Sequence, residues 1–497
     1  MPGVVPPARG RQRRPGAVGG VAPQAARPGA AGRPARPAEG APGGQETREA
    51  TAPRQQQPFQ VGQEIEVAIE GVAQGGWCIA RPEGLPVMFV RHALPGERVT
   101  ARVTEVTSKF ARADAVRVLE ASPDRVTAPC PSARPGGCGG CDWQHASLPA
   151  QRALKAAVVE QQLKRLAGLD RTVTVEPLAG DGPTADGTPG LGWRTRVQFA
   201  VDQRGVAGLR AHRSHRVVDV GDCLIAHPFI RDLGVTDADW SGATGIETVV
   251  GSLDTDENYT VTVLEDAADR REGGPRPGRK GQPRARDRGN PGRGRAARTR
   301  RTVAAGLPYL AEQAAGRLWQ VSADGFWQVH PAAAGTLSRA VVEALNPAPG
   351  DTVLDLYCGA GLFAGALAPL VGPDGAVTGV ESDPAAVKNA RQNLADFPWA
   401  SLREADVAEA AGDPALASSR LVVADPPRAG LAADVVGFLN GDSQAERFAY
   451  VSCDPATLAR DLALLIAGGW RLDQLRAFDA FPMTHHVECV ATLTRAR

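Results

Sequence analysis

The sequence predicts a multidomain protein with an N-terminal small β-barrel, a central α+β region and a C-terminal doubly wound α/β sheet. The first observation is its length of 497 residues, because a single hydrophobic core seldom grows past about 250 to 300 residues. The second is a run of short alternating segments over 58–120, which is typical of antiparallel strands. The third is the alternation of strand and helix patterns over 331–497, which is typical of a parallel sheet.

Two basic segments stand apart from the regions that are expected to fold. Residues 1–57 carry nine Arg against three Glu, and residues 270–301 carry thirteen Arg or Lys against two acids, although the whole chain has a net charge of only +1. Their Gly- and Pro-rich composition buries too little apolar surface to offset the entropy of ordering. We therefore expect a disordered tail and a disordered basic insertion, which either attract a polyanion or, for the tail, only add solubility.

The barrel prediction for 58–120 rests on stretches such as EIEVAIE and RVTARVTEV, which lie between Gly or Pro turns. About five short strands are expected, with Lys109, Arg112 and Arg117 near the last of them. A small barrel with basic side chains suits single-stranded nucleic acid. The stretch resembles a TRAM domain, an RNA-binding barrel related to the OB-fold.

The central region, 121–330, begins with a cysteine cluster and continues with LPAQRALKAAVVEQQLKRLAGL at 148–169. The apolar spacing of this segment predicts an amphipathic helix that ends at Gly168. Residues 193–267 alternate again and predict strands of a second β-rich region, which the basic insertion interrupts.

The C-terminal region, 331–497, opens with a predicted helix over 332–345. Predicted strands follow in DTVLDLY, AVTGVE, LVVADPP and RFAYVSCDP, and VECVATLTR forms the last one. In a doubly wound sheet, ligands bind beyond the carboxyl ends of the strands. The residues that follow these strands are therefore the first candidates for a functional site.

A glycine loop follows the first of these strands in TVLDLYCGAG. Gly359 and Gly361 let the backbone approach a ligand where a side chain would block it, although an ordinary βαβ turn is the alternative. Twenty residues beyond Gly361, Glu381 ends the next strand, where a carboxylate can accept ribose hydroxyls. The arrangement resembles the S-adenosylmethionine site of class I methyltransferases, and this resemblance places Asp406 beside the adenine.

A cysteine follows a buried strand in YVSCDPATL, 28 residues after the aspartate of LVVADPPRAG. Cys453 suits a target atom that is a poor nucleophile, because thiolate addition at carbon 6 of uracil makes carbon 5 reactive toward a methyl sulfonium. The site should then lower the pKa of the thiol with a cation, for which Arg428 is the candidate. A base must also remove the carbon 5 proton, and Glu488 opens the last strand beside His485 and His486. A buried structural cysteine is the alternative.

The motifs D-L-Y-C-G-x-G, D-P-P-R, S-C-D-P and F-P-x-T-x-H-V-E occur in this order. Together they resemble the RNA uridine-5 methyltransferase family over about 59–497. By this resemblance Cys453 is the nucleophile and Glu488 is the base, while Leu362 departs from the Asn or Thr that the family often has there. The resemblance also implies a set of cofactor or site residues: Gln328 in DGFWQVHP, Tyr357, Gly359, Gly361, Glu381, Asp406 and Asp425.

The cysteine cluster C-P-S-A-R-P-G-G-C-G-G-C places three cysteines at spacings of x7 and x2, and a fourth lies in DVGDCLIAHP. Four thiolates suit either a structural zinc ion or an iron–sulfur cluster. The three-plus-one pattern is similar to the 4Fe-4S site of TRAM-bearing family members, where x5 replaces x7. The resemblance therefore implies a 4Fe-4S cluster, with zinc or no metal as alternatives, on Cys130, Cys138, Cys141 and Cys223.

The resulting hypothesis is an S-adenosylmethionine-dependent RNA methyltransferase that makes 5-methyluridine from a base flipped out of its stack. The family resemblance favours 23S ribosomal RNA, with tRNA as a second possibility. One alternative is RNA cytosine-5 methylation, in which a cysteine usually follows the Pro-Pro where Arg428 stands here. Another is a non-catalytic RNA-binding or ribosome-assembly factor that keeps the fold.

The sequence also favours a cytoplasmic protein without a membrane segment. No apolar run approaches the roughly 20 residues of a membrane span, and MPGVVPPARGRQRRPGA lacks the apolar core of a signal peptide. Eight cysteines are too few for a disulfide scaffold in a chain of this length. We expect a monomer that meets RNA in a reducing compartment.

Overall fold

The computed structural model describes residues 59–179, 189–253, 255–266 and 299–495. The predicted disordered tail lies outside these ranges, as does the predicted insertion from 270 to 298. The last three residues assigned to the insertion, 299–301, instead begin a strand. They pair with the strand that ends at Asp266, and Arg301 forms an ion pair with Glu247. The predicted end of the insertion is therefore wrong by three residues, because backbone pairing and this charge contact order them.

The N-terminal region forms a six-stranded sheet in the order β1-β5-β6-β4-β3-β2. Alternate side chains of these strands, among them Val67, Met88 and Val99, are buried in a core of their own. The predicted number of about five strands is one too few. The strands are β1 (Glu64–Ala68), β2 (Gly71–Ala73), β3 (Trp77–Ala80), β4 (Val87–Arg91), β5 (Arg98–Val106) and β6 (Phe110–Glu120).

The amphipathic helix predicted over 148–169 is confirmed as α1 (Leu148–Gln162) with a π-helical turn, η1 (Leu163–Ala167). Ser147 caps its start by accepting a hydrogen bond from the Ala150 amide. Gly168 ends it with a left-handed φ of 66°, a conformation that glycine adopts without steric cost. Neither α1 nor any other helix in the described ranges is long and apolar enough to cross a membrane.

The central β-rich region forms a second six-stranded sheet in the order β10-β9-β8-β11-β12-β13. A separate hairpin, β14-β15, follows it and was not predicted. The elements are β8 (Arg196–Val201), β9 (Ala207–Arg210), β10 (Val217–Val218), α2 (Pro228–Asp232), η2 (Val235–Asp237), β11 (Gly245–Val250), β12 (Tyr259–Asp266), β13 (Thr299–Gly306), β14 (Tyr309–Ala314) and β15 (Arg317–Ser322).

The C-terminal region forms an eight-stranded sheet in the order β18-β17-β16-β19-β20-β22-β21-β7. The strands from β18 to β20 run parallel, whereas β22 runs antiparallel to both of its neighbours. The doubly wound sheet is confirmed, but β7, β18 and β21 were not predicted. Its strands are β16 (Thr352–Leu356), β17 (Ala376–Glu381), β18 (Ala400–Glu404), β19 (Leu421–Ala424), β20 (Arg447–Ser452), β21 (Trp470–Asp479), β22 (Glu488–Arg495) and β7 (Val175–Pro177).

Helices cover both faces of this sheet, and Leu362 is buried in one of its two cores. The predicted helix over 332–345 is confirmed as α3, one residue shorter. The helices are α3 (Ala333–Leu345), α4 (Leu362–Val371), α5 (Pro384–Asn393), α6 (Val407–Ala410), α7 (Pro414–Ala417), α8 (Ala433–Asn440) and α9 (Pro455–Ala467).

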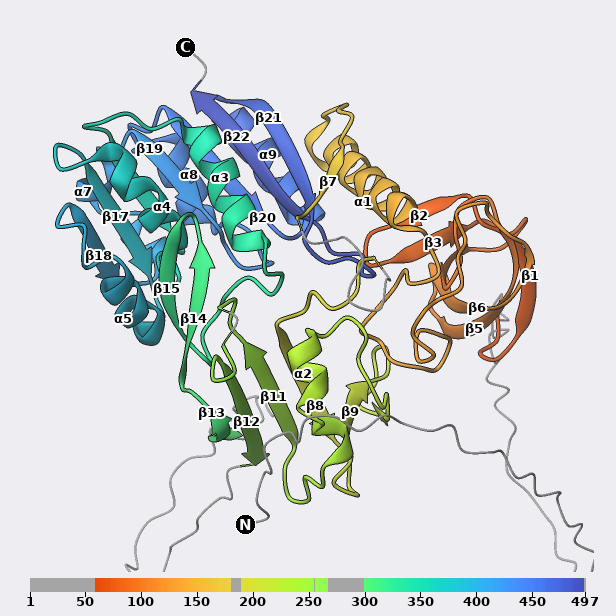
Figure 1. Cartoon of the computed structure of the whole chain (residues 1–497). Coiled ribbons are helices and arrows are strands. Elements are labelled where there is room, and N and C mark those ends of the chain that lie inside the picture. Colours follow the sequence, from red (N-terminus) through yellow and green to blue (C-terminus); the bar gives the residue numbers. More distant parts are fainter. Residues whose placement is uncertain (1–58, 180–188, 254, 267–298, 496–497) are drawn as a thin grey trace, which may run out of the picture.

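Helix α1 joins the barrel to the C-terminal sheet, between which it lies in Figure 1. On one side, Val72 and Leu94 of the barrel pack with Leu154 and Val158 of α1. On the other side, the fully buried Lys155 forms an ion pair with Asp479 at the end of β21. Its ammonium also donates a hydrogen bond to the carbonyl of Phe481, 3.0 Å away. The three regions are therefore locked together near the start of the F-P-M-T-H-H-V-E segment.

We expect Lys155→Met to lower the free energy of unfolding by about 3–5 kcal/mol, because it leaves the buried Asp479 carboxylate without its cation. Urea denaturation of the whole protein measures this change. Lys164→Met is the matched control, since the Lys164–Asp170 pair is exposed and should contribute less than about 1 kcal/mol. Equal effects of the two substitutions would contradict the structural role of the buried pair.

Candidate active site

Three adjacent strands bring the predicted catalytic residues to one edge of the C-terminal sheet. Asp425 follows the carboxyl end of β19, and Cys453 follows the carboxyl end of β20. Glu488 begins β22, which runs antiparallel to β20 with Ser452 opposite Cys489. Continuing this register by one step sets Cys453 opposite Glu488. The strand pairing therefore brings together residues that are far apart in the chain.

The electrostatic environment of Cys453 favours the neutral thiol. Burial, followed by the Glu488 and Asp425 carboxyls, raises the pKa of Cys453 to about 12, and Arg428 only partly opposes this. Arg428 lowers this pKa as predicted, but the expected net lowering is wrong, because the pKa is raised overall. Arg428 lies where it was expected to act, but one cation does not offset desolvation and two acidic neighbours.

Burial raises the pKa of both carboxyl groups, and the charge of Asp425 raises that of Glu488 further. Burial raises the pKa of Asp425 to about 7. Burial, and then the nearby Asp425, raises the pKa of Glu488 well above its usual range. A raised pKa makes a carboxylate a stronger base near neutral pH. The site thus combines a thiol with two carboxyls that can take up protons.

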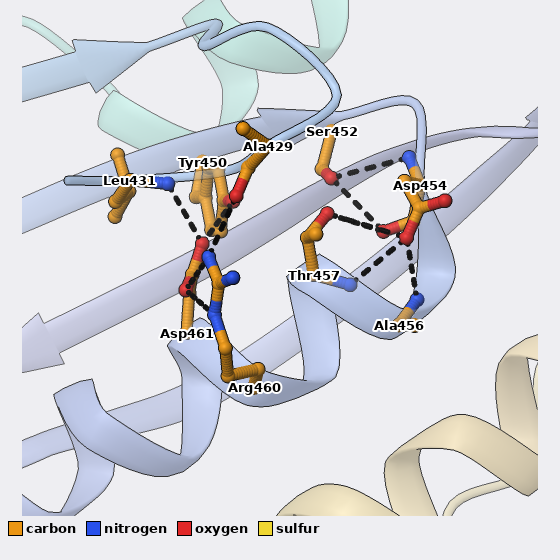
Figure 2. Close-up of polar contacts among 9 residues, drawn as sticks. All are labelled: Ala429, Leu431, Tyr450, Ser452, Asp454, Ala456, Thr457, Arg460 and Asp461. Carbon is orange, nitrogen blue, oxygen red and sulfur yellow. Dashed lines mark hydrogen bonds and ion pairs between the residues drawn. The ribbon is translucent and has the colours of Figure 1, made fainter. Parts of the chain in front are cut away.

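The loop that carries Cys453 is fixed by the first turn of α9 (Figure 2). The Asp454 side chain caps the helix, because one of its oxygens accepts hydrogen bonds from the amides of Ala456 at 3.0 Å and Thr457 at 2.9 Å. Ser452 lies on the other side of the cysteine, and its hydroxyl donates to the Asp454 carbonyl at 3.3 Å. Both neighbours of the cysteine are therefore held.

Asp461 on α9 holds the loop after the D-P-P-R motif (Figure 2). Its carboxylate accepts hydrogen bonds from the Tyr450 hydroxyl at 2.7 Å and from the Leu431 amide at 2.9 Å. Arg460 donates to the carbonyl of Ala429 at 2.8 Å. One helix thus fixes both the cysteine loop and the loop that follows Asp425.

The predicted glycine loop folds against the carboxylate that ends β17. The Gly359 amide donates to Glu381 at 3.0 Å, and the amides of Ser382 and Asp383 donate to the other carboxylate oxygen. Gly359 and Gly361 have positive φ values of 54° and 90°, which favour glycine. A β-carbon at Gly359 would meet no atom within 4 Å, so the loop faces open space.

Asp355 lies near the end of β16, just before the glycine loop, and one of its carboxylate oxygens is buried without a partner among the described residues. One oxygen accepts a hydrogen bond from the Ala364 amide at 2.8 Å, whereas the other has no partner among the described residues. Burial and the nearby Asp425 and Glu381 raise the pKa of Asp355 to about 8. An unsatisfied buried oxygen beside the open Gly359 fits a site that receives a polar ligand.

A cavity of about 540 Å³ opens next to this loop. It is lined by Tyr357, which has a strained φ of 63°, and by Asp406, whose carboxylate caps α6. Gln328 lies in the chain segment between β15 and α3. It is buried and is not among the residues that line this cavity. Two of the predicted cofactor residues therefore share a cavity, while Gln328 lies apart from it.

The four predicted ligand cysteines converge on another cavity, of about 380 Å³. Burial raises the pKa of Cys223 to about 11 and that of Cys138 above its usual value, and each is raised further by another cysteine of the set. In the described ranges no three His, Cys, Asp or Glu side chains are arranged to hold a metal ion. The four thiols are nevertheless the chemical type that binds zinc or an iron–sulfur cluster, and all four line the cavity: Cys130, Cys138, Cys141 and Cys223.

The structure shows contacts of His485 and His486, in the loop before Glu488, that the sequence did not reveal. His485 Nδ1 lies 2.6 Å from a carboxylate oxygen of Asp142, which directly follows the cysteine cluster. His486 Nε2 lies 3.4 Å from Arg428, and burial with its charged neighbours lowers the pKa of His486 to about 3. The fold brings this loop close to Asp142 and to Arg428, and no spacing in the sequence indicates this proximity.

Comparisons with known proteins give the family. Residues 58–116 match the TRAM domain family, and residues 347–413 match a methyltransferase domain family. Residues 416–496 match the tRNA (Uracil-5-)-methyltransferase family. An RNA methyltransferase of Streptomyces avermitilis is 47% identical over 449 residues, which cover 88% of this chain and 99% of that protein. The 23S rRNA (uracil(1939)-C(5))-methyltransferase RlmD of Methylococcus capsulatus is 34% identical over 454 residues, which cover 87% and 97%. The chain belongs to the RNA uracil-5-methyltransferase family.

A solved structure confirms the fold of this family member over most of its length. Pyrococcus abyssi tRNA (uracil-54, C5)-methyltransferase in complex with S-adenosyl-L-homocysteine matches it with a TM-score of 0.60 and 22% identity. The match covers 86% of this chain and 100% of the other. The predicted resemblance to TRAM-bearing uridine-5 methyltransferases is thus confirmed, and the chain is an S-adenosylmethionine-dependent RNA methyltransferase.

We expect the alkylation of Cys453 by iodoacetamide to accelerate about tenfold per pH unit between pH 7 and 10, because its thiolate fraction rises in proportion below the pKa. Asp425→Asn removes a charge that raises this pKa and should accelerate the reaction. Arg428→Ala removes the opposing charge and should slow it. Peptide-resolved mass spectrometry measures the rates.

Arg428→Lys is the control for this experiment, since it keeps the charge and should retain most of the rate. Alkylation of the buried Cys489 gives an internal reference in every variant. Faster alkylation after Arg428→Ala would contradict the electrostatic assignment.

Proposed function

We propose that the protein transfers a methyl group to carbon 5 of a uridine in 23S ribosomal RNA through a covalent Cys453–uracil adduct. The observation that carries this proposal is the strand register that sets Ser452 opposite Cys489, so that the next residues, Cys453 and Glu488, lie at the same sheet edge as Asp425. Nucleophilic addition at carbon 6 and proton removal at carbon 5 concern adjacent atoms of one ring. A thiol and a base on facing strands suit both steps.

The first step is the addition of the Cys453 sulfur to carbon 6 of the uracil. The thiol keeps its proton at neutral pH because the pKa of Cys453 is raised to about 12, so a base must remove this proton before the addition. Asp425, whose pKa is raised to about 7, is the neighbouring carboxylate that takes this proton. The new S–C6 bond moves electron density to carbon 5, which then attacks the methyl group.

The second step restores the aromatic ring. Glu488, in its carboxylate form, removes the proton from carbon 5, and the S–C6 bond breaks to release Cys453 as a thiolate. The thiolate takes its proton back from Asp425, and Glu488 passes its proton to solvent. The raised pKa of Glu488 suits this role, since a base of higher proton affinity pulls the carbon-bound proton more strongly. The products are the methylated RNA, the demethylated cofactor and one proton.

S-adenosylmethionine, when bound, supplies the methyl group. The open glycine loop, the carboxylate that ends β17 and the unpaired Asp355 oxygen support its placement beyond the carboxyl ends of β16 and β17. The cavity beside them offers room for the nucleoside. We propose these residues as its binding set: Gln328, Tyr357, Gly359, Gly361, Glu381, Asp406 and Asp425.

The relative RlmD supports 23S ribosomal RNA as the substrate, because that enzyme methylates uracil 1939 of that RNA. The archaeal tRNA enzyme and the matching family description keep tRNA as a second candidate. Cytosine-5 methylation is disfavoured by Arg428, which stands where those enzymes usually carry a cysteine. Presence of both Cys453 and Glu488 disfavours a factor that only binds RNA.

The four cysteines, in this proposal, hold a 4Fe-4S cluster with a role in folding or RNA binding. Convergence of their side chains on one cavity supports a four-thiolate site. A zinc ion with the same four ligands is the alternative. Methyl transfer involves no electron transfer, so the cluster takes no part in the steps above.

Mass mapping of 5-methyluridine in ribosomal and transfer RNA tests the reaction and the substrate. In cells that lack the protein, one uridine of 23S ribosomal RNA should lose its methyl group and regain it only with the wild-type chain. Cys453→Ala should lower the rate by at least about a thousandfold, because the uncatalysed carbon 5 is a poor nucleophile.

Glu488→Gln is the companion variant, since it keeps the shape of the side chain but removes the base. It should accumulate protein joined covalently to RNA, visible as a band that survives denaturing electrophoresis. Persistence of every 5-methyluridine without the protein would overturn the uridine assignment, and loss of a tRNA methyl group would move the substrate to tRNA.

Metal analysis after oxygen-free purification tests the cysteine site. We expect about four iron and four sulfide per chain, with loss of both in Cys141→Ser, because removal of one thiolate opens the cluster. Cys78→Ser is the control, since Cys78 is buried in the barrel away from the site. One zinc per chain would support the alternative, and neither metal would overturn a four-thiolate centre.

A further inference from the structure

A turn of the barrel reaches the active-site edge of the C-terminal sheet. Gln74, between β2 and β3, donates a hydrogen bond from its side-chain amide to a carboxylate oxygen of Asp454 at 2.8 Å. The two residues are separated by 380 positions in the chain, and both are partly buried. Asp454 directly follows Cys453, so the barrel touches the residue next to the proposed nucleophile.

The two oxygens of Asp454 have separate partners. One caps α9 through the amides of Ala456 and Thr457, as Figure 2 shows, and the other receives the hydrogen bond from Gln74. The carboxylate therefore lies between the helix and the barrel. A shift of the Gln74 turn would change the direction of this carboxylate and of the backbone at Cys453.

The turn that carries Gln74 is itself held on both sides. Gly76 has a φ of 78°, and a β-carbon there would lie 2.9 Å from the Asp142 side chain. The next residue, Trp77, packs edge-on against His212 of the central region at 5.6 Å, and the Arg112 guanidinium lies 5.4 Å from its ring. Contacts with Asp142 and His212 of the central region and with Arg112 of the barrel thus hold the turn and the Gln74 that it carries.

We propose that Gln74 is a positioning residue, by which the barrel holds the Asp454 carboxylate and so sets the Cys453 sulfur against the uracil. Gln74 touches neither reacting atom and takes no proton. The inference rests on the proposed function and extends it, because it gives the barrel a role in turnover as well as in RNA binding. A hydrogen bond to a charged acceptor is strong enough for this role.

Steady-state kinetics on the RNA substrate separate positioning from binding. Gln74→Ala should lower kcat about tenfold and change KM for RNA less than about threefold, because small misplacements of a nucleophile act on the chemical step. Gln74→Asn should behave alike, since its amide is one methylene shorter. Gln63→Ala, on an exposed part of the barrel, is the matched control and should retain wild-type values.

A double variant tests the contact itself. Gln74→Glu sets a carboxylate against Asp454 and should lower kcat at least about tenfold. Asp454→Asn still caps α9, and its amide nitrogen can donate to the new carboxylate. Gln74→Glu should therefore cost less than about threefold when it is measured in the Asp454→Asn background.

Hydrogen exchange gives a reading that does not depend on activity. In Gln74→Ala, amides of the peptide 453–458 should exchange about threefold faster or more, while peptides of β16 and β17 keep their rates. Urea denaturation of the same samples must give wild-type free energies of unfolding for the comparison. Gln74→Asn replaces any variant that is destabilised as a whole.

The outcomes distinguish failure of this inference from failure of the proposed function. Three results would overturn the role of Gln74. The first is a raised KM with unchanged kcat in Gln74→Ala, and the second is an equal loss of kcat from Gln74→Glu in the wild-type and Asp454→Asn backgrounds. The third is unchanged hydrogen exchange over 453–458 in Gln74→Ala. Absence of 5-methyluridine formation by the wild-type protein would overturn the proposed function instead. Exchange would then decide alone whether Gln74 orders the cysteine loop.

Discussion

The buried ion pair between Lys155 and Asp479 is the constraint on which the arrangement of the three regions depends. Both side chains are fully buried, and such a pair persists only when the surrounding structure keeps its geometry. It fixes α1 to the end of β21 and, through the Phe481 carbonyl, to the start of the segment that leads to Glu488. Because the barrel packs on the same helix, this pair also sets where Gln74 can reach.

Burial at the active site sets the chemistry by keeping protons on groups that would otherwise lose them. Burial raises the pKa values of Cys453, Asp425 and Glu488, so each of these neighbouring groups holds its proton more tightly than it would in water. Desolvated acids change their protonation readily when a charged ligand enters.

The sequence predicted the parts that depend on local pattern. The end of α1 at Gly168 follows from glycine's freedom at positive φ. Cys453 and Glu488 each adjoin an apolar strand in the sequence, and the pairing of these strands places both at one sheet edge. Strand β7 was missed because it has only three residues and its pairing partner, β21, lies about 300 residues away in the chain. The pKa of Cys453 was predicted in the wrong direction, because charge at Arg428 is visible in a sequence and desolvation is not.

The long-range contacts share one physical feature, which is that each joins a loop of the catalytic edge to an element from the first third of the chain. Gln74 holds the residue after Cys453, and Asp142 holds His485, three residues before Glu488. Asp142 also directly follows Cys141 of the cysteine cavity. The loops of a doubly wound sheet are not rigid by themselves, so neighbours must fix them. The loops that carry Cys453 and Glu488 each gain such a neighbour, so the barrel and the cysteine segment help to fix the proposed catalytic edge.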